Sequence, residues 1–170
     1  MEKNTPRFLI LAGVRLSDLV VRTPCVNTIT PSVKVYSEIP KEFTDVKTWP
    51  TFTNLKCHHC GVIPKDYPRF IPTNPRKDAT GAFRCGVMGV FHTWNCAAAY
   101  IETQIPERIR RETQRVLCIV EEKFTGRRRA YIPAAPPCTE KREYCGSSGL
   151  TPVEYDRKIA ELDAVCSIYI

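Results

Sequence analysis

Hydrophobic and polar positions follow different patterns along the chain. Two short apolar stretches near the start, "RFLILAGV" (7–14) and "SVKVYS" (32–37), are rich in β-branched residues and predict strands. Residues 38–50 combine two prolines with mixed charge, which indicates an extended linker. Residues 64–81 contain four prolines, which exclude a helix there. The first half of the chain is therefore expected to be strands and extended segments.

The pattern changes around residue 92. The stretch "AFRCGVMGVF" (82–91) alternates enough to predict a β-hairpin that bends at Gly86 or Gly89. Residues 92–103 are good helix formers, and Thr93 or Asn95 is placed to cap that helix. A switch from strand to helix is thus expected at this point.

Two further helices are predicted toward the C-terminus. Residues 105–124 form the longer one, with Pro106 in the first turn and Gly126 after the last. Its expected apolar stripe consists of Ile109, Val116, Ile119 and Val120. Residues 151–165 form the second, because Thr151, Pro152 and Glu154 match a capping box.

These elements predict an α+β fold. We expect a small zinc-stapled domain of knuckle, β-hairpin and helix, followed by a long amphipathic helix and a C-terminal helix. The expected parts are an N-terminal β-rich arm (1–48), a zinc finger (49–104) and a helical region with a basic, proline-rich loop (105–170). Together they make one compact domain, since 170 residues is an ordinary domain length.

Charge and cysteine content narrow the function. The net charge of +7 favours polyanionic partners such as nucleic acid. The apolar stretch 7–14 is too short to span a bilayer and is soon followed by Arg15 and Asp18, so no membrane segment or secretory signal is expected. An intracellular location keeps thiols reduced, and the nine cysteines then favour zinc over disulfides.

The spacing of Cys57, Cys60 and Gly61 is that of a zinc knuckle. Two residues between the cysteines let both thiolates face one metal, with backbone amides pointing at the sulfurs. Glycine suits the left-handed turn that such a loop needs. Redox motifs share this spacing, but they are followed by a helix, whereas here a proline-rich segment follows.

His92 and Cys96 supply the other half of the predicted site. They are four residues apart, which places them one turn from each other on one helix face. The quartet Cys57, Cys60, His92 and Cys96 predicts one structural Zn²⁺ with tetrahedral coordination. Cys85 is an alternative ligand but is expected to pack in the core, while His58 and His59 are expected to face solvent or a partner. No motif of a catalytic zinc, and no pairing of nucleophile with base, was found.

These residues resemble a known family. "WPTFTNLKCHHC", "PRFIP" and "FRCGVMGVFHTWNCAAAYI" are similar to the zinc-finger late transcription factors of nucleocytoplasmic large DNA viruses, the relatives of poxviral late transcription factor 2, whose finger is of the MYM/FCS type. Later segments, "EEKFTGRRRAYIPAAPP" and "GSSGLTPVEYDR", follow in the family's order, so the resemblance covers about residues 49–157. His92 departs from the family, which usually has cysteine there. Imidazole is an acceptable zinc ligand, so the site is expected to survive.

The resemblance implies a non-enzymatic viral protein that acts with the viral RNA polymerase or other transcription factors late in infection, in the host cytoplasm or nucleus. The expected contact surface for DNA or RNA is basic: Arg108, Arg111, Arg115, Arg127, Arg128 and Arg129. The alternative function is a protein–protein adaptor that binds a host factor through Trp94, Tyr131 and the proline-rich stretch 133–137.

Overall fold

The computed structural model describes residues 36–167, with side chains to residue 165. These residues belong to the second of two units, Met1–Lys34 and Val35–Ile170. The predicted strand at 7–14, and most of the one at 32–37, lie outside the described residues. Tyr36 and Ser37, which end the second stretch, have no regular secondary structure.

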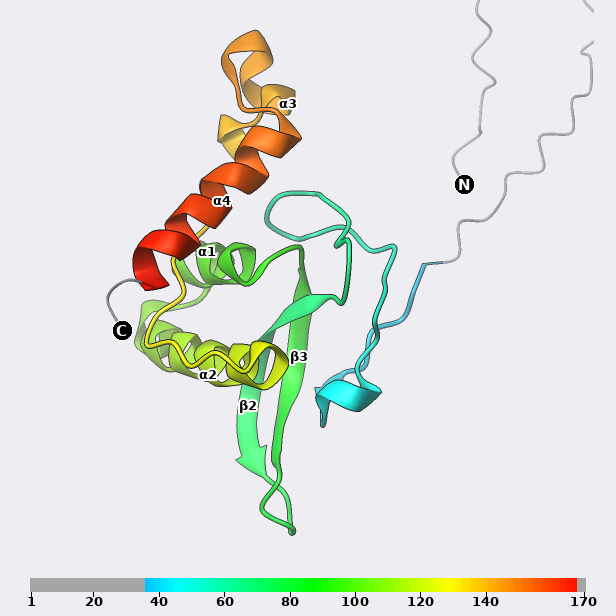
Figure 1. The fold of residues 1–170 in the computed structure, drawn as a ribbon. Helices are drawn as coiled ribbons and strands as arrows, with labels where there is room; N and C mark the ends of the chain where they lie inside the picture. The colour runs from blue at the N-terminus through cyan, green and yellow to red at the C-terminus, as the bar shows by residue number, and fades with distance from the viewer. Residues whose placement is uncertain (1–35, 168–170) are drawn as a thin grey trace, which may run out of the picture. The chain divides into compact units, whose positions relative to one another are not determined.

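A three-stranded antiparallel sheet forms the base of the described fold (Figure 1). Its strands are β1 (Glu42–Phe43), β2 (Arg69–Lys77) and β3 (Phe83–Phe91), in the order β1-β3-β2. The prediction of a hairpin within residues 82–91 was wrong, because these residues form a single strand that pairs with β2. Sequence reasoning missed β2 because of Pro72 and Pro75. An edge strand accepts prolines, and the register of β2 shifts between Thr73 and Arg76.

The expected linker at residues 38–50 contributes two large side chains to the core. Phe43 lies in β1, Trp49 follows the 3-10 turn η2 (Val46–Thr48), and both side chains are buried. The two rings are 5.7 Å apart and pack against Phe70 and Phe124. Trp49 Nε1 donates a hydrogen bond of 2.8 Å to the Pro68 carbonyl. Two large aromatic side chains thus outweigh the linker-like composition around them.

Four α-helices accompany the sheet in the described part of the chain: α1 (Trp94–Gln104), α2 (Glu107–Thr125), α3 (Arg142–Cys145) and α4 (Pro152–Ser167). Short 3-10 turns, η3 (Cys138–Glu140) and η4 (Gly146–Ser148), flank α3. Helices α1 and α2 pack on each other and against β2 (Figure 1). The described residues are therefore α+β, as the sequence predicts.

The capping predictions are confirmed. Thr93 Oγ1 accepts a hydrogen bond of 3.1 Å from the Cys96 amide at the start of α1. At the start of α4, Thr151 Oγ1 accepts from the Glu154 amide at 3.3 Å, and the Glu154 carboxylate accepts from the Thr151 amide at 2.8 Å. These local sequence rules therefore place both helix starts correctly.

The buried face of α2 differs from the predicted stripe. Val116 and Val120 are buried, but Ile109 and Ile119 are 43% and 45% exposed. The other buried positions of this helix are Leu117, Cys118 and Glu121. Gly126 ends the helix with a φ of 70°, as expected of a glycine after the last turn. Among residues 36–167, no helix combines the length and the apolar character that crossing a membrane requires.

Candidate metal centre

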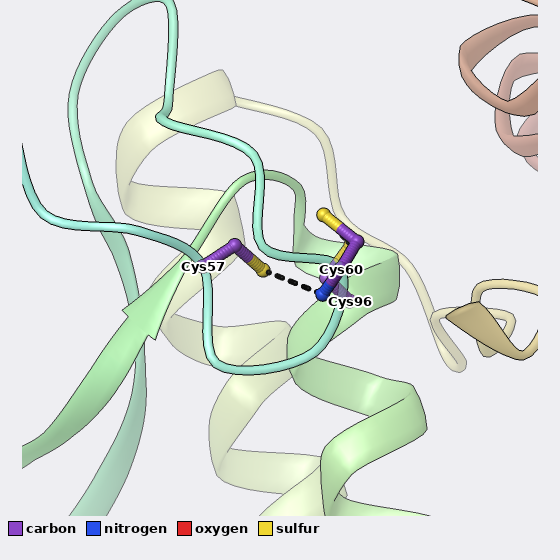
Figure 2. Close-up of side chains that lie close together, drawn as sticks. All are labelled: Cys57, Cys60 and Cys96. Atoms are coloured by element: carbon purple, nitrogen blue, oxygen red, sulfur yellow. Dashed lines mark hydrogen bonds between the residues drawn. The ribbon is translucent and has the colours of Figure 1, made fainter. Parts of the chain in front are cut away.

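The knuckle turn, residues 57–61, forms as the spacing predicts. The Gly61 amide donates a 3.0 Å hydrogen bond to the Cys57 carbonyl, and Gly61 has a φ of 73°. The amides of His59 and Cys60 point at Cys57 Sγ, at 3.4 and 3.5 Å. The second of these contacts is visible in Figure 2. Such amides stabilise a thiolate at Cys57.

Cys96 brings a third thiol to this turn from the first turn of α1 (Figure 2). Its Sγ lies 3.8 Å from Cys60 Sγ, and the three sulfurs of Cys57, Cys60 and Cys96 lie within 4.8 Å of one another, all buried. A tetrahedral zinc with Zn–S bonds of about 2.3 Å separates its sulfurs by about 3.8 Å. Three of the four predicted ligands thus come together in a cluster that could hold a metal ion.

The pKa values of the three thiols differ because they are so close. Hydrogen bonds from Cys60 and Cys96 lower the pKa of Cys57 to about 2, whereas the contact with Cys57 raises that of Cys60 to about 12. The contacts with Cys57 and Cys60 also raise the pKa of Cys96 far above its usual range. The cluster by itself therefore favours one thiolate. A divalent cation among the sulfurs would stabilise all three as thiolates.

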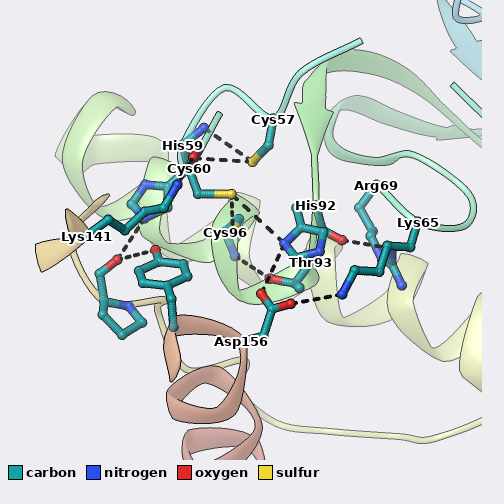
Figure 3. Close-up of polar contacts among 12 residues, drawn as sticks. Cys57, His59, Cys60, Lys65, Arg69, His92, Thr93, Cys96, Lys141 and Asp156 are labelled. Carbon is teal, nitrogen blue, oxygen red and sulfur yellow. Dashed lines mark hydrogen bonds and ion pairs between the residues drawn. The ribbon is translucent and has the colours of Figure 1, made fainter. Parts of the chain in front are cut away.

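His92 lies beside the three cysteines, although not on the helix. It comes between the end of β3 and the cap of α1, so the expectation that it shares a helix face with Cys96 was wrong. Its Nδ1 is 4.0 Å from Cys60 Sγ and 3.9 Å from Asp156 Oδ1 (Figure 3). Burial lowers the pKa of His92, which favours the neutral, metal-binding ring. His92 as the fourth ligand stays a prediction.

Other residues hold the turn in place, and sequence reasoning did not find them (Figure 3). The buried Lys141 donates 2.9 Å hydrogen bonds to the Cys60 carbonyl and to Glu143. The Pro136 carbonyl accepts from Tyr155 Oη at 2.6 Å and lies 3.0 Å from His59 Nε2. Because these partners are more than 70 residues from the turn, no local spacing could have indicated them.

Cys85 and His58 have structural surroundings of their own. Cys85 lies in β3 opposite Phe43, outside the cysteine cluster, and burial raises its pKa to about 12. Core packing is what the sequence predicted for it. His58 is exposed, also as expected, but its Nδ1 accepts a 3.3 Å hydrogen bond from the Val90 amide. Its own amide donates to the Val90 carbonyl at 2.9 Å, which fastens the turn to β3.

The attachment of the knuckle turn to β3 requires a glycine at position 89. Gly89 has a φ of 71°, and a Cβ there would lie 2.6 Å from His58 Nδ1. Gly81 has a φ of 82° but open space around it. Each Gly→Ala change costs about 1 kcal/mol for the positive φ. Gly89→Ala is expected to lose about a further 1 kcal/mol or more, as His58 and the Phe91 ring, 2.9 Å from that Cβ, are displaced.

Urea unfolding of the two metal-loaded variants measures the difference. Gly81→Ala serves as the matched control, since it repeats the backbone cost without the contact. Equal losses of unfolding free energy in both variants would show that the His58 contact does not stabilise the turn.

The six arginines of the expected contact surface differ in exposure. Five are exposed: Arg108, Arg111, Arg115, Arg127 and Arg128. The sixth, Arg129, has a side chain that is only 11% exposed and is held between Glu121 and Asp163. Its charge is neutralised inside the protein, so Arg129 is not available to bind phosphate.

Comparison with known proteins identifies relatives in one virus. No family model matches the chain, and no solved structure does. The protein B175L of African swine fever virus, described as an uncharacterized protein, matches in the Pretoriuskop, Badajoz and Kenya isolates. Each is 33% identical over 150 residues, which is 86% of this chain and 86% of the relative. The chain therefore belongs to the family of the African swine fever virus protein B175L.

Proposed function

We propose that this viral protein is a non-enzymatic regulator of late viral transcription, built around one structural zinc ion. The observation that carries the proposal is that the segment similar to the late transcription factors supplies residues of the candidate site. Phe91, Trp94, Asn95, Cys96 and Ala97 are all buried, and Cys96 belongs to the cysteine cluster. This burial supports the proposal, because a zinc finger would use such a segment to enclose its metal site.

Zinc is the metal that the donor set favours. Three thiolates select zinc over magnesium or calcium, which prefer oxygen ligands. His92 Nδ1 would complete a tetrahedral Cys₃His site, with Asp156 next to it. All four donors are buried, which is typical of a structural ion that excludes water. The ion would join the knuckle turn to β3 and α1.

The exposed arginines would supply the contact with nucleic acid or with an acidic surface of the polymerase. Arg108, Arg111 and Arg115 are three and four residues apart on α2, and Arg127 and Arg128 follow the helix. Exposed guanidinium groups bind phosphates without reading the base sequence. The protein would act in the viral factory of the cytoplasm or in the nucleus.

A hollow beside the knuckle favours the alternative, a protein–protein adaptor that binds a host factor. It measures about 640 Å³ and is lined by apolar groups of Tyr100, Ala135 and Pro137, with His58 and His59 at one side. Trp94, which the sequence assigned to such an interface, is buried and cannot contribute. The adaptor function thus has a groove and keeps the exposed Tyr131, but it loses Trp94, one of its two expected aromatic contacts.

Affinity purification of the tagged chain from infected cells separates the two functions. Viral RNA polymerase subunits are expected with the wild-type chain and with Cys85→Ala, but not with Cys96→Ser. Elemental analysis of the purified chain is expected to give one zinc per molecule. Recovery of a host protein without any polymerase subunit would support the adaptor and contradict the transcription role.

A further inference from the structure

A small hollow on the outer side of α2 gathers groups that are separated in sequence. It measures about 310 Å³ and is lined by Arg111, Gln114, Arg115, Cys118, Ala130 and Tyr131. The four α2 residues are at positions i, i+3, i+4 and i+7, so they share one face of the helix. After Gly126 the chain turns back along α2, which brings Tyr131 to the same place (Figure 1).

The aromatic wall of this hollow is oriented by a hydrogen bond. Tyr131 is 46% exposed, and its Oη donates to Glu102 Oε1 at 2.9 Å. Gln114 Nε2 approaches the same carboxylate oxygen at 3.4 Å. Glu102 is not part of the lining, but it holds the Tyr131 ring and the Gln114 amide in place at the wall of the hollow. A ring held in this way is oriented in advance for stacking.

The charge of the hollow is positive. Arg111 and Arg115 are exposed. Glu112 is 3.8 Å from Arg115 and itself mostly exposed, whereas the Glu102 carboxylate is held by Tyr131 and Gln114. Such a surface ion pair is weak, so both guanidinium groups are free to take a phosphate instead. Cys118, which is nearly buried, forms an apolar floor. An exposed aromatic ring beside two arginines is the combination that binds single-stranded nucleic acid.

We propose that this hollow binds one unpaired nucleotide of a single strand. The base stacks on Tyr131, Gln114 contacts its edge, and Arg111 and Arg115 bind the adjoining phosphates. In a duplex both faces of each base are stacked against neighbouring base pairs, so no face is left to stack on Tyr131. A phosphopeptide would need the arginines but not the ring. The proposal rests on the proposed function. It narrows the general contact with nucleic acid to one site, and to single strands as opposed to duplexes.

Fluorescence anisotropy with the metal-loaded full chain tests the site. The probes are labelled oligothymidylate, oligouridylate, a mixed-sequence duplex and a phosphoserine-rich peptide. Tyr131→Ala is expected to weaken binding of the single strands by about tenfold or more. Tyr131→Phe keeps the ring but loses the hydrogen bond to Glu102, so it is expected to weaken binding less. Arg111→Gln with Arg115→Gln is expected to reduce the slope of log K against log salt by about 1.4. The zinc content of each variant is measured as a check that the variant is folded.

A matched control separates this site from charge alone. Lys47→Gln with Lys77→Gln removes the same charge at exposed positions outside the proposed contact surface and is expected to weaken binding much less. Equal weakening by both pairs, with no effect of Tyr131→Ala, would overturn the nucleotide site while leaving general contact with nucleic acid intact. Absence of any binding of nucleic acid at low salt would contradict that general contact as well.

Two further outcomes decide the ligand. Photocrosslinking of an oligouridylate that carries 5-iodouracil is expected to label Tyr131, as mapped by mass spectrometry, and requires no variant. Labels elsewhere on the chain would overturn the site. Tighter binding of the phosphoserine peptide than of any single strand, unaffected by Tyr131→Ala, would assign the hollow to a phosphorylated protein instead.

Discussion

The Cys96→Ser variant is expected to lose its metal and, with it, the cooperative fold of the described residues. Cys96 is fully buried and is the thiol that joins the knuckle turn to α1. Structural zinc contributes about 10–16 kcal/mol in small zinc domains, which exceeds the stability of most single domains. Serine is a poor zinc ligand and would place a hydroxyl among apolar groups. Elemental analysis and thermal unfolding, with and without a chelator, measure both effects.

Cys85→Ala is the matched control for this variant. Cys85 is equally buried but lies in β3, outside the cysteine cluster. It is expected to keep one zinc per chain and to lose only about 1 kcal/mol, because the side chain removed is small. His92→Ala is expected to bind zinc more weakly. Full retention of zinc by Cys96→Ser, or its loss from Cys85→Ala, would contradict the assigned ligands.

Arg129→Met is expected to destabilise the protein by about 3–5 kcal/mol. The Arg129 guanidinium donates to Glu121 and, at 2.8 Å, to Asp163, and the Glu121 side chain is almost completely buried. Removing the arginine would leave a buried carboxylate without its cation. Urea unfolding of the metal-loaded protein at neutral pH measures the loss. Arg128→Met, next in sequence but exposed, is expected to change stability by less than about 0.5 kcal/mol.

The loss of stability in Arg129→Met is expected to depend on pH, because it comes from the buried carboxylate of Glu121. Burial raises the pKa of Glu121 above its ordinary value of 4.5, and the hydrogen bond from Arg129 opposes the rise. In Arg129→Met the pKa of Glu121 rises further. Between pH 4.5 and that raised pKa, Glu121 is protonated in the folded variant but ionised in the unfolded chain. Stability of the variant relative to wild type should therefore increase as the pH falls from 7 toward 4.5.

A double variant completes this test. Glu121→Leu combined with Arg129→Met removes both charges and is expected to recover most of the lost stability, since no buried carboxylate is left unpaired. If the double variant is as unstable as Arg129→Met alone, packing of the arginine stem, and not its charge, accounts for the loss.

Much of the candidate site could be predicted because its rules are local. The turn at Cys57 and Cys60, the cap at Thr93 and the capping box at Thr151 each depend on residues within a few positions of one another. Side-chain types and spacings suffice for such features. The same holds for Cys96, which is placed by the helix that its neighbours start.

Features that depend on distant partners were not predictable in this way. β2 is a strand because β3 pairs with it, in spite of its prolines. Arg129 looked like a surface charge because its partners Glu121 and Asp163 are 8 and 34 residues away. Tyr131 joins Arg111 and Arg115 only after the chain reverses at Gly126. In each case tertiary contacts decide the outcome, and the local sequence shows no trace of them.

The hydrogen bonds around the knuckle turn also set the order in which the protein matures. Cys60 and Lys141 are 81 residues apart, His59 and Pro136 are 77 apart, and Lys65 and Asp156 are 91 apart. Closing such long loops is slow and costs entropy. The turn leaves the ribosome early, but its surroundings cannot be completed until synthesis has passed Asp156. Completion of these surroundings is therefore expected only after all four predicted metal ligands, Cys57 to Cys96, have been synthesised.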